Sequence, residues 1–239
     1  MKAVILAGGK GTRLAPYTVA FPKPLMPIGE HPILEIVIKQ LRYHGFKEII
    51  LAVGHLAELI MTFFGDGSKY GVKIKYSREN TPLGTAGPLG LLKEELRDTF
   101  LVMNGDVLSS LNYHSFVEYH KKNKSHATIA LAKRGVEIDF GVIEVDGKED
   151  VIGYTEKPNI EYLVSTGIYL FEPEVLDYIK PKKKMDLPDL IRELIKDGSK
   201  VKGYVNDAYW LDIGRPEDYE KANADFEKLK EKFLPKGIK

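Results

Sequence analysis

The segment with the clearest chemistry follows the first apolar run of the chain. Residues 3–7 are apolar, and a glycine-rich loop that ends in a fixed cation comes next: Gly8, Gly9, Gly11 and Arg13. Glycines let a backbone approach a bulky ligand and turn its N–H groups toward it. A guanidinium offers several donors to phosphate oxygens. The pattern indicates a binding loop for a phosphate-rich nucleotide, and a plain tight turn after a strand is the alternative.

The two best-known nucleotide-binding loops do not fit this segment. A dinucleotide-binding fingerprint requires a third glycine at the position where Leu14 stands. A P-loop requires Ser or Thr directly after its Gly-Lys pair, and here Lys10 is followed by Gly11. The loop therefore argues against a nicotinamide-dependent dehydrogenase and against a P-loop NTPase.

A proline-rich stretch presents a second cation. Lys23 stands between Pro22 and Pro24, and Pro16 and Pro27 lie close by in the sequence. Proline fixes the backbone angle φ and is rare at this density inside a helix or strand. We therefore expect a rigid loop that aims the Lys23 ammonium at a ligand.

Two carboxylates lie where they could hold a cation. Asp106 comes shortly after the predicted strand 100–103, and ligands of open α/β sheets bind beyond the carboxyl ends of the strands. Asp212 lies in the apolar run 210–214, where a buried carboxylate needs a partner. Two aspartates with no histidine or cysteine nearby suit Mg²⁺. For Asp106 the alternative is a turn carboxylate that caps the next helix.

A third group of polar residues comes later in the chain. Glu156 and Lys157 directly follow the predicted strand 151–155. Near a phosphate site, Lys157 could neutralise a second phosphate while Glu156 accepts hydrogen bonds from hydroxyls; the alternative is a surface ion pair of little consequence. Gly141 and Gly167 lie within predicted strands, where a glycine marks either close approach of a ligand or a β-bulge.

The composition is that of an ordinary globular protein. The 239 residues include 35 Lys and Arg and 34 Asp and Glu, so the net charge of +1 provides no field that would attract nucleic acid or an acidic membrane. The chain has no cysteine, which excludes disulfides, a thiolate nucleophile and a Cys-based zinc site. It shows no signal peptide and no apolar run of 18 residues. We expect a cytoplasmic protein that binds small molecules, with no nucleic-acid or membrane partner.

Strands and helices must alternate to bring these residues together. Over the first part of the chain the predicted elements are 3–7, 32–43, 48–53, 55–64, 72–76, 85–97 and 100–103. This order predicts an α/β fold of three layers, with a largely parallel, Rossmann-like sheet between helices. After a helix at 112–122, closely spaced strands are expected to add antiparallel: 127–132, 140–145, 151–155 and 161–171. The remaining predicted elements are helices 173–179, 188–197 and 216–232 and a strand at 202–204.

In this order the motifs resemble those of the sugar-1-phosphate nucleotidylyltransferases over residues 1–226. The opening G-G-x-G-T-R-L with P-K-P about ten residues later is highly specific, whereas each later motif alone is weak. The resemblance implies the nucleotide-diphospho-sugar transferase fold and a Mg²⁺-dependent transfer from a nucleoside triphosphate to a sugar 1-phosphate, with release of pyrophosphate. We predict one domain over 1–239, with a nucleotide-binding part (about 1–110) and a sugar-phosphate-binding part with the last helix (about 111–239).

The resemblance also implies roles for individual residues. Arg13, Lys23 and Asp106 would be catalytic, and Asp106 and Asp212 would hold Mg²⁺. The base would lie against the stretch 82–87. The nucleotide would contact Leu6, Ala7, Gly8, Gly9, Gly11, Thr12, Arg13 and Gly84. The sugar phosphate would contact Gly141, Glu156, Lys157 and Thr166.

The resemblance leaves several alternatives. The stretch 82–88 is similar to mannose-1-phosphate guanylyltransferases, whereas Thr166 and Gly167 are similar to thymidylyl- and uridylyltransferases for glucose 1-phosphate; we favour GTP and mannose 1-phosphate. A non-catalytic regulatory subunit is a second class, although it need not keep the charged site. A glycosyltransferase would normally carry Asp-x-Asp where 104–106 reads Asn-Gly-Asp. Because the sequence ends at Lys239, we expect no β-helix extension, and self-association would use other surfaces.

Overall fold

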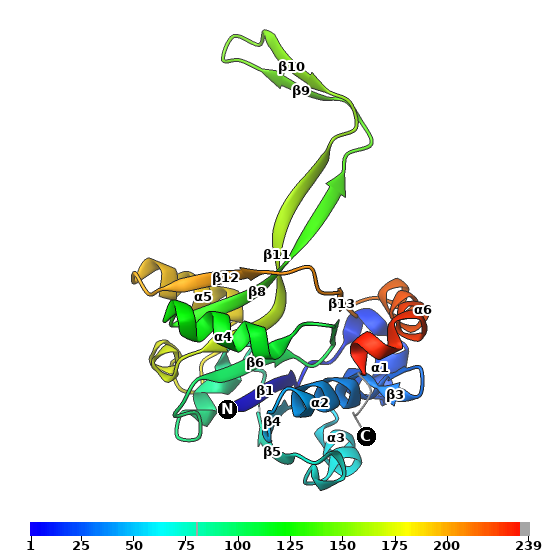
Figure 1. The fold of residues 1–239 in the computed structure, drawn as a ribbon, viewed down its shortest axis with the longest axis vertical. Helices are drawn as coiled ribbons and strands as arrows, with labels where there is room; N and C mark the ends of the chain where they lie inside the picture. The colour runs from blue at the N-terminus through cyan, green and yellow to red at the C-terminus, as the bar shows by residue number, and fades with distance from the viewer. Residues whose placement is uncertain (80, 235–239) are drawn as a thin grey trace.

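The computed structural model describes residues 1–79 and 81–234, and a seven-stranded sheet lies at its centre (Figure 1). The strand order is β12-β8-β11-β6-β1-β4-β5. Six of these strands run in one direction: β1 (Lys2–Ala7), β4 (Glu48–Val53), β5 (Lys73–Arg78), β6 (Phe100–Asn104), β8 (Ala127–Glu137) and β12 (Val201–Val205). β11 (Asn159–Phe171) lies antiparallel between β6 and β8. The predicted mixed, mainly parallel sheet is confirmed.

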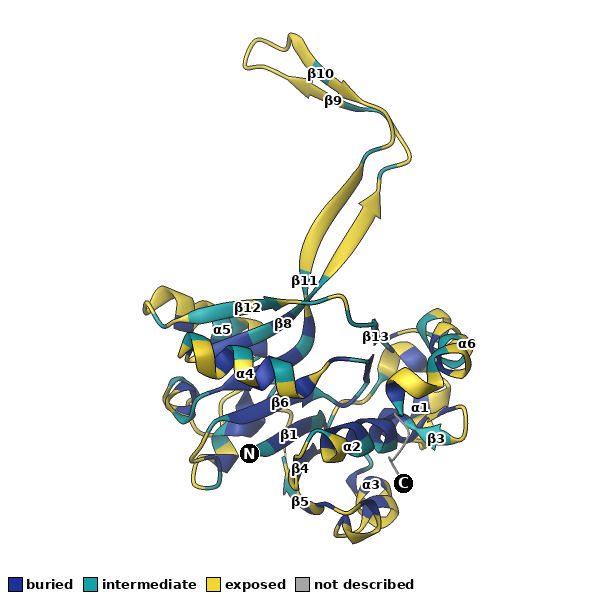
Figure 2. Cartoon of the chain, viewed as in Figure 1, coloured by how far each residue is buried: buried dark blue, intermediate teal, exposed yellow. Residues whose placement is uncertain are grey.

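Helices cover both faces of the sheet, which explains why buried residues of β1 alternate between two cores. Ala3 and Ile5 belong to the core on one face, and Val4 belongs to the core on the other. The first face is covered by α2 (Ile33–Tyr43), α3 (Ala57–Phe64) and α4 (Tyr113–Asn123). The second is covered by the 3₁₀-helices η4 (Gly87–Leu92) and η5 (Pro173–Tyr178) and by α5 (Leu187–Lys196). The three-layer prediction is confirmed, and the buried strands between the layers are visible in Figure 2.

A third core cluster lies beside the main sheet and under the glycine-rich loop. It packs α6 (Pro216–Phe233) against two small antiparallel sheets, β2 (Pro27–Ile28) with β3 (His31–Pro32) and β7 (Val107–Ser109) with β13 (Trp210–Asp212). Its buried members are Leu14, Met26, Ile28, Ile33, Ile36, Leu108, Leu211, Ile213, Ala222, Phe226 and Phe233. Three of them are sequence neighbours of charged residues predicted for the site. This cluster therefore anchors the segments that carry those charges.

A two-stranded arm, defined as residues 133–164, extends from the body (Figure 1). Its stem continues the β8–β11 ladder from Lys133 opposite Leu163 to Glu137 opposite Asn159. Its tip is the antiparallel pair β9 (Val142–Val145) and β10 (Val151–Thr155). Among the described residues, none of the arm belongs to any of the three core clusters. Figure 2 shows the arm exposed along most of its length.

Several predicted elements are wrong in type or place. The predicted helix 85–97 holds only the short η4, because Gly84 has a left-handed φ of 78° and Pro88 cannot donate a helical hydrogen bond. The helix predicted at 173–179 is the 3₁₀-helix η5. The strands predicted at 140–145 and 151–155 form the tip of the arm and add nothing to the main sheet. β7 and β13 were not predicted, since three residues are too few to show a period.

The helices of the described part, 1–79 and 81–234, are all either too short or too polar to cross a membrane. The longest, α6, has 18 residues and is rich in Glu and Lys.

Candidate active site

A cleft of about 830 Å³ opens at the carboxyl ends of the parallel strands, within the size range of small-molecule sites. The residues predicted for nucleotide binding, catalysis and metal binding all line it: Leu6, Ala7, Gly8, Gly9, Gly11, Thr12, Arg13, Lys23, Gly84, Asp106 and Asp212. These residues come from parts of the chain more than 200 positions apart. The cleft is therefore built by the fold as a whole.

The glycine-rich loop runs from the end of β1 along one wall of the cleft. Its carbonyl oxygens are held from outside: Thr18 Oγ1 donates to Gly11 O at 2.7 Å, and the His55 N–H donates to Gly8 O at 3.2 Å. Gly11 has a φ of 62°, a left-handed conformation that residues with a Cβ rarely adopt. The loop is thus fixed before any ligand arrives.

Lys23 forms an ion pair with Asp106 at the floor of the cleft. The Lys23 side chain is almost fully buried, and the 3₁₀-turn η2 (Lys23–Leu25) fixes its backbone. Asp106 lies just after β6, where the Gly105 N–H donates to Leu6 O of β1 at 2.9 Å. A buried ammonium of this kind requires an anion. In the free protein that anion is Asp106.

The pairing of β7 with β13 brings the two predicted metal ligands together. Asp212 stands opposite Val107, and the Ile213 N–H donates to Asp106 O at 3.1 Å. Burial raises the pKa of the Asp212 carboxyl, and the charge of Asp106 raises it further, while Lys23 and Arg13 act in the opposite direction. The ionised form of Asp212 is therefore under electrostatic strain that an added cation would relieve.

Arg13 lies beside the same carboxylates. A Cβ built on Gly214 would be 3.2 Å from Arg13 Nη1, so the guanidinium packs against the backbone that follows β13. Two cations and two carboxylates thus converge on one part of the cleft. This arrangement can bind phosphate oxygens directly through the cations and indirectly through a metal ion.

The donor set fits Mg²⁺ better than a metal that needs a complete protein cage. Within residues 1–79 and 81–234, no cluster of three or more His, Asp or Glu side chains could hold a metal ion alone. Asp106 and Asp212 supply two carboxylates, one of which is disfavoured as an anion by its neighbour. Mg²⁺ is commonly held by one or two carboxylates together with phosphate oxygens and water. The residues present fit that pattern.

The opposite wall of the cleft is locked to the segment before α5. Thr85 N–H donates to Asp186 Oδ1 at 3.0 Å, and Leu187 N–H donates to Thr85 Oγ1 at 2.8 Å. The turn at Gly84 permits this contact, because a Cβ there would lie only 2.5 Å from Met185 O. The wall is therefore rigid where the base was predicted to bind.

Sequence reasoning missed Glu79, which also lines the cleft. Its Oε2 accepts a hydrogen bond from the Leu83 N–H at 3.0 Å, and a Cβ on Gly8 would lie 2.8 Å from its Oε1. Arg78, Lys10 and His55 also line the cleft and were not assigned. Arg78 ends β5 and Glu79 follows it, whereas the end of this strand was predicted two residues early, at residue 76. With β5 ending at Arg78, both would have stood at the ligand-binding edge of the sheet.

The four residues predicted to contact the sugar phosphate do not line the cleft. Gly141, Glu156 and Lys157 lie in the arm, where Tyr154 OH donates to Glu156 Oε2 at 2.6 Å. Thr166 is buried at the base of the arm and its Oγ1 donates to Ala130 O at 2.9 Å. Gly141, Glu156 and Lys157 lie outside the cleft because β8 and β11 run on beyond the sheet. Their roles stay predictions.

Known proteins share this sequence pattern and fold. A family model described as nucleotidyl transferase matches residues 2–229. The chain is 39% identical to the UTP–glucose-1-phosphate uridylyltransferase of Synechocystis sp. over 93% of this chain and 62% of that protein. It is 35% identical to the mannose-1-phosphate guanylyltransferase of Mycobacterium tuberculosis over 93% of this chain and 64% of that protein. The chain thus spans less than two thirds of the length of these curated relatives.

A solved structure of similar size matches almost end to end. HddC from Yersinia pseudotuberculosis, complexed with GMP-PN, superposes with a TM-score of 0.72 at 30% identity. The match covers 94% of this chain and 99% of that one.

Proposed function

The chain belongs to the nucleotidyl transferase family, and we propose that it transfers a nucleotidyl group from a nucleoside triphosphate to a sugar 1-phosphate. The observation that carries the proposal is the convergence of Arg13, Lys23, Asp106 and Asp212 in one cleft beside a fixed glycine-rich loop. The names of both curated relatives describe enzymes for sugar 1-phosphates. The reaction also agrees with a chain that contains no cysteine nucleophile.

The proposed reaction needs positioning and charge neutralisation more than a protein nucleophile. A phosphate oxygen of the sugar 1-phosphate attacks the α-phosphorus of the triphosphate and forms a new P–O bond. The bond from that phosphorus to the bridging oxygen breaks, and its electron pair leaves with pyrophosphate. Lys23 would neutralise charge at the α-phosphate, and Arg13 would hold the departing pyrophosphate. Asp106 would orient Lys23 until substrate phosphate competes for the ammonium.

Asp106 and Asp212 are the residues that would hold Mg²⁺. The bound ion would supply neutralisation of phosphate charge. The raised pKa of Asp212 supports this assignment, because burial and the neighbouring charge of Asp106 raise it, and a cation would offset both.

We propose GTP as the nucleotide because of Glu79. An ionised carboxylate only accepts hydrogen bonds. Guanine presents two adjacent N–H donors at N1 and N2, whereas uracil and thymine present one N–H between two carbonyl oxygens that a carboxylate repels. Mannose 1-phosphate follows from the similarity to guanylyltransferases. The higher identity to a glucose-1-phosphate uridylyltransferase supports UTP with glucose 1-phosphate as the second candidate.

The test is release of pyrophosphate by the purified protein with Mg²⁺ and a panel of triphosphates and sugar 1-phosphates. We expect GTP with mannose 1-phosphate to give the highest kcat/KM. A higher kcat/KM for UTP with glucose 1-phosphate would show that the proposed substrates are wrong, while the proposed type of reaction would stand. No turnover with any pair, together with tight binding of a nucleotide sugar, would indicate a regulatory subunit instead.

The location in the cytoplasm and the division of one domain near residue 110 stay predictions. The lining of the cleft bears on the predicted division into a nucleotide-binding part and a sugar-phosphate-binding part. Asp212 and Gly214 line it together with residues from the first 106 positions, so the proposed nucleotide site draws on both parts of the chain.

A further inference from the structure

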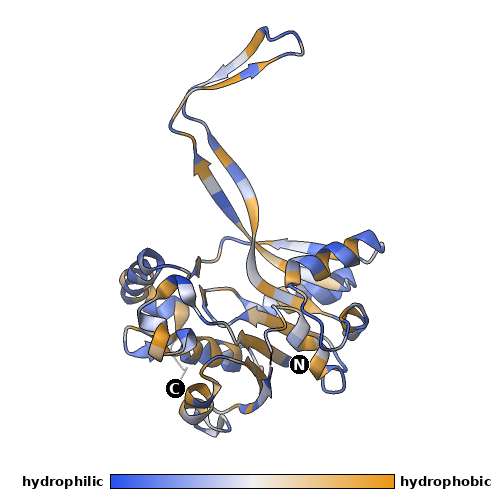
Figure 3. Cartoon of the chain, turned by 180° about the vertical axis from the view of Figure 1, so that it is seen from behind, coloured by the Kyte–Doolittle hydropathy of each residue, from blue (hydrophilic) through white to orange (hydrophobic). Residues whose placement is uncertain are grey.

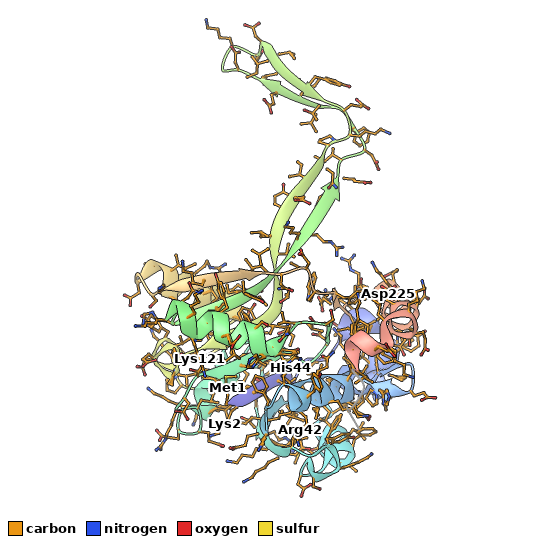
Figure 4. All side chains as sticks on the ribbon, in the orientation of Figure 1. Met1, Lys2, Arg42, His44, Lys121 and Asp225 are labelled. Atoms are coloured by element: carbon orange, nitrogen blue, oxygen red, sulfur yellow. The ribbon has the colours of Figure 1, made fainter. Side chains whose placement is uncertain are left out.

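The arm exposes apolar side chains on both of its faces. Phe140 is 76% exposed, and the consecutive residues Val151 and Ile152 are each 65% exposed, so neither face of β10 is covered. Apolar and polar residues alternate along the arm in Figure 3, and Figure 4 shows side chains that project on both sides, away from the body. A lone two-stranded hairpin is only marginally stable in water. The arm therefore needs a surface to pack against.

The hydrogen bonds of the tip join arm residues to one another. Ile138 N–H donates to Pro158 O at 3.1 Å, and Asp146 Oδ1 accepts from the Lys148 and Asp150 N–H groups. Nothing in the core clusters of the described chain ties the arm to its own body. The missing surface must come from elsewhere.

The charge of the arm is complementary to the rest of its own chain. Residues 133–164 contain eight acidic and four basic side chains, which gives the arm a charge of −4. Since the whole chain carries +1, the remainder carries +5. The cleft is lined by four of these cations, Lys10, Arg13, Lys23 and Arg78, and by the carboxylates Glu79, Asp106 and Asp212, so its lining carries a charge of +1. The body of a second copy, with a net charge of +5, thus has the sign opposite to that of the arm.

The arm rises from the sheet edge that carries the cleft. β8 is antiparallel to β11, and β11 is antiparallel to β6, so β8 ends at the same edge as β6. The stem has five paired residues per strand, about 17 Å of extended chain. Glu156 and Lys157 follow the tip strand β10, beyond the far end of the stem. A straight stem therefore holds them far outside the cleft of their own chain.

We propose that two copies of this chain exchange arms, with each arm lying across the cleft edge of the other copy. If a two-fold axis relates the copies, both arms dock on equivalent surfaces, and one self-complementary interface covers the apolar side chains of both. In this dimer Glu156 and Lys157 of the partner subunit complete the sugar-phosphate side of each cleft. This last part rests on the proposed function, whereas the docking of the arm does not.

The first test is the mass of the protein in solution, measured by light scattering. Wild type is expected at twice the chain mass of 26.9 kDa. Ile152→Asp, and a variant whose residues 138–158 are replaced by an Asn-Gly turn, are expected to be monomeric. Ile195→Asp in α5 is the matched control, since Ile195 is similarly exposed at 60%, and it should stay dimeric. A monomeric wild type, or a dimer that survives replacement of the tip, overturns the proposal.

The second test distinguishes a shared site from a site completed within one chain. The Lys23→Ala variant has a defective cleft and an intact arm, and the Lys157→Ala variant has an intact cleft and a defective arm. After the two are dissociated, mixed and reassociated, random pairing should restore about one quarter of the wild-type rate, because half of the dimers contain one complete site. A mixture no more active than its components overturns the shared site. If wild type itself shows no turnover, the proposed reaction fails while arm-dependent dimerisation is still measured by mass.

Discussion

The charged side chains of the cleft belong to segments that pack on a buried apolar cluster, whereas those of the arm belong to a two-stranded ladder with no apolar core beneath it. Leu14, Met26 and Ile213 lie beneath the cleft and belong to the third core cluster. Over residues 133–164 the structure shows no buried residue. The cleft is therefore preorganised by packing within the chain, whereas the arm owes its shape to backbone pairing and a few side-chain hydrogen bonds. The comparison teaches that the two regions should respond differently to the same kind of substitution.

The largest difference is expected for loss of an aromatic ring. Phe226 is fully buried under the cleft and stacks on Phe233 at 5.7 Å, so Phe226→Ala should lower the free energy of unfolding by about 3–5 kcal/mol. Phe140→Ala in the arm should change it by less than about 0.5 kcal/mol. Urea denaturation of dilute protein, where association contributes least, measures both. Equal losses would remove the contrast between the two regions.

Loss of a cleft charge should abolish most activity while the fold persists. Lys23→Ala and Asp106→Ala should each reduce turnover at least about a hundredfold, since single contacts to developing charge in such sites are worth about 3 kcal/mol. Pyrophosphate release measures turnover, and circular dichroism checks the fold. Lys148→Ala, which removes an arm lysine, is the control. Near-normal turnover in either cleft variant would contradict the role assigned to that residue.

The rigid wall of the cleft can be tested with two glycines that share a left-handed φ. Gly84 and Gly45 have φ of 78° and 88°, but a Cβ would meet Met185 O at 2.5 Å at Gly84 and nothing within 4 Å at Gly45. Gly45→Ala should cost about 1–2 kcal/mol of unfolding free energy. Gly84→Ala should cost about 2 kcal/mol more, because backbone must shift, and should also raise the KM for the triphosphate. Similar losses of unfolding free energy for Gly84→Ala and Gly45→Ala would mean that the backbone around Gly84 moves easily and that this wall is not rigid.

The choice of base should depend on Glu79. Glu79→Gln keeps an oxygen for the Leu83 N–H but adds an amide donor, so kcat/KM for GTP should fall relative to UTP by about tenfold. Competition between the two triphosphates in one assay measures the ratio. Glu144→Gln in β9 is the arm counterpart and should leave the ratio unchanged. An unchanged ratio for Glu79→Gln as well would remove the argument for guanine.

The smallest expected effect concerns stability against pH. Burial and the charge of Asp106 raise the pKa of Asp212, so its ionised form costs folding free energy at neutral pH. That cost is absent below the ordinary pKa of 3.8, grows as the pH rises from 3.8 to the raised pKa, and stays constant above it. Without metal, Asp212→Asn should therefore melt slightly above wild type at pH 7, with a gap that closes toward pH 3.8. Asp139→Asn on the arm should show no such gap, and a lower melting temperature for Asp212→Asn at pH 7 would refute the assignment.

Much of the cleft was predictable because its residues carry local signals. The glycine-rich loop and Asp106 each follow a strongly apolar strand, and Lys23 stands in a stretch where prolines exclude regular structure. Glu79 was missed because the end of its strand was placed two residues early, which left no reason to single out a surface glutamate. Such errors of boundary are small in sequence, but they decide which side chains reach the ligand edge of a sheet.

The arm was not predictable from the same signals. Alternating apolar and polar residues indicate strands over 127–171. The alternation is the same whether two paired strands lie within the central sheet or extend past its edge, so it does not predict the arm. The pairing of β7 with β13, which brings Asp106 beside Asp212, gave no signal of its own because each strand has only three residues; the joint role of the two carboxylates was expected from the resemblance. Both features arise from contacts between distant parts of the chain.

The position of α6 has a consequence for the order of events during protein synthesis. Asp106 leaves the ribosome long before Asp212, and α6, which packs beneath both, occupies residues 216–233. A nascent chain can therefore complete the β1–β4–β5–β6 part of its sheet while the two carboxylates are still apart. The charged centre assembles only after residues 210–233 have left the ribosome. Until then a growing chain lacks the pair of carboxylates proposed to hold the metal ion.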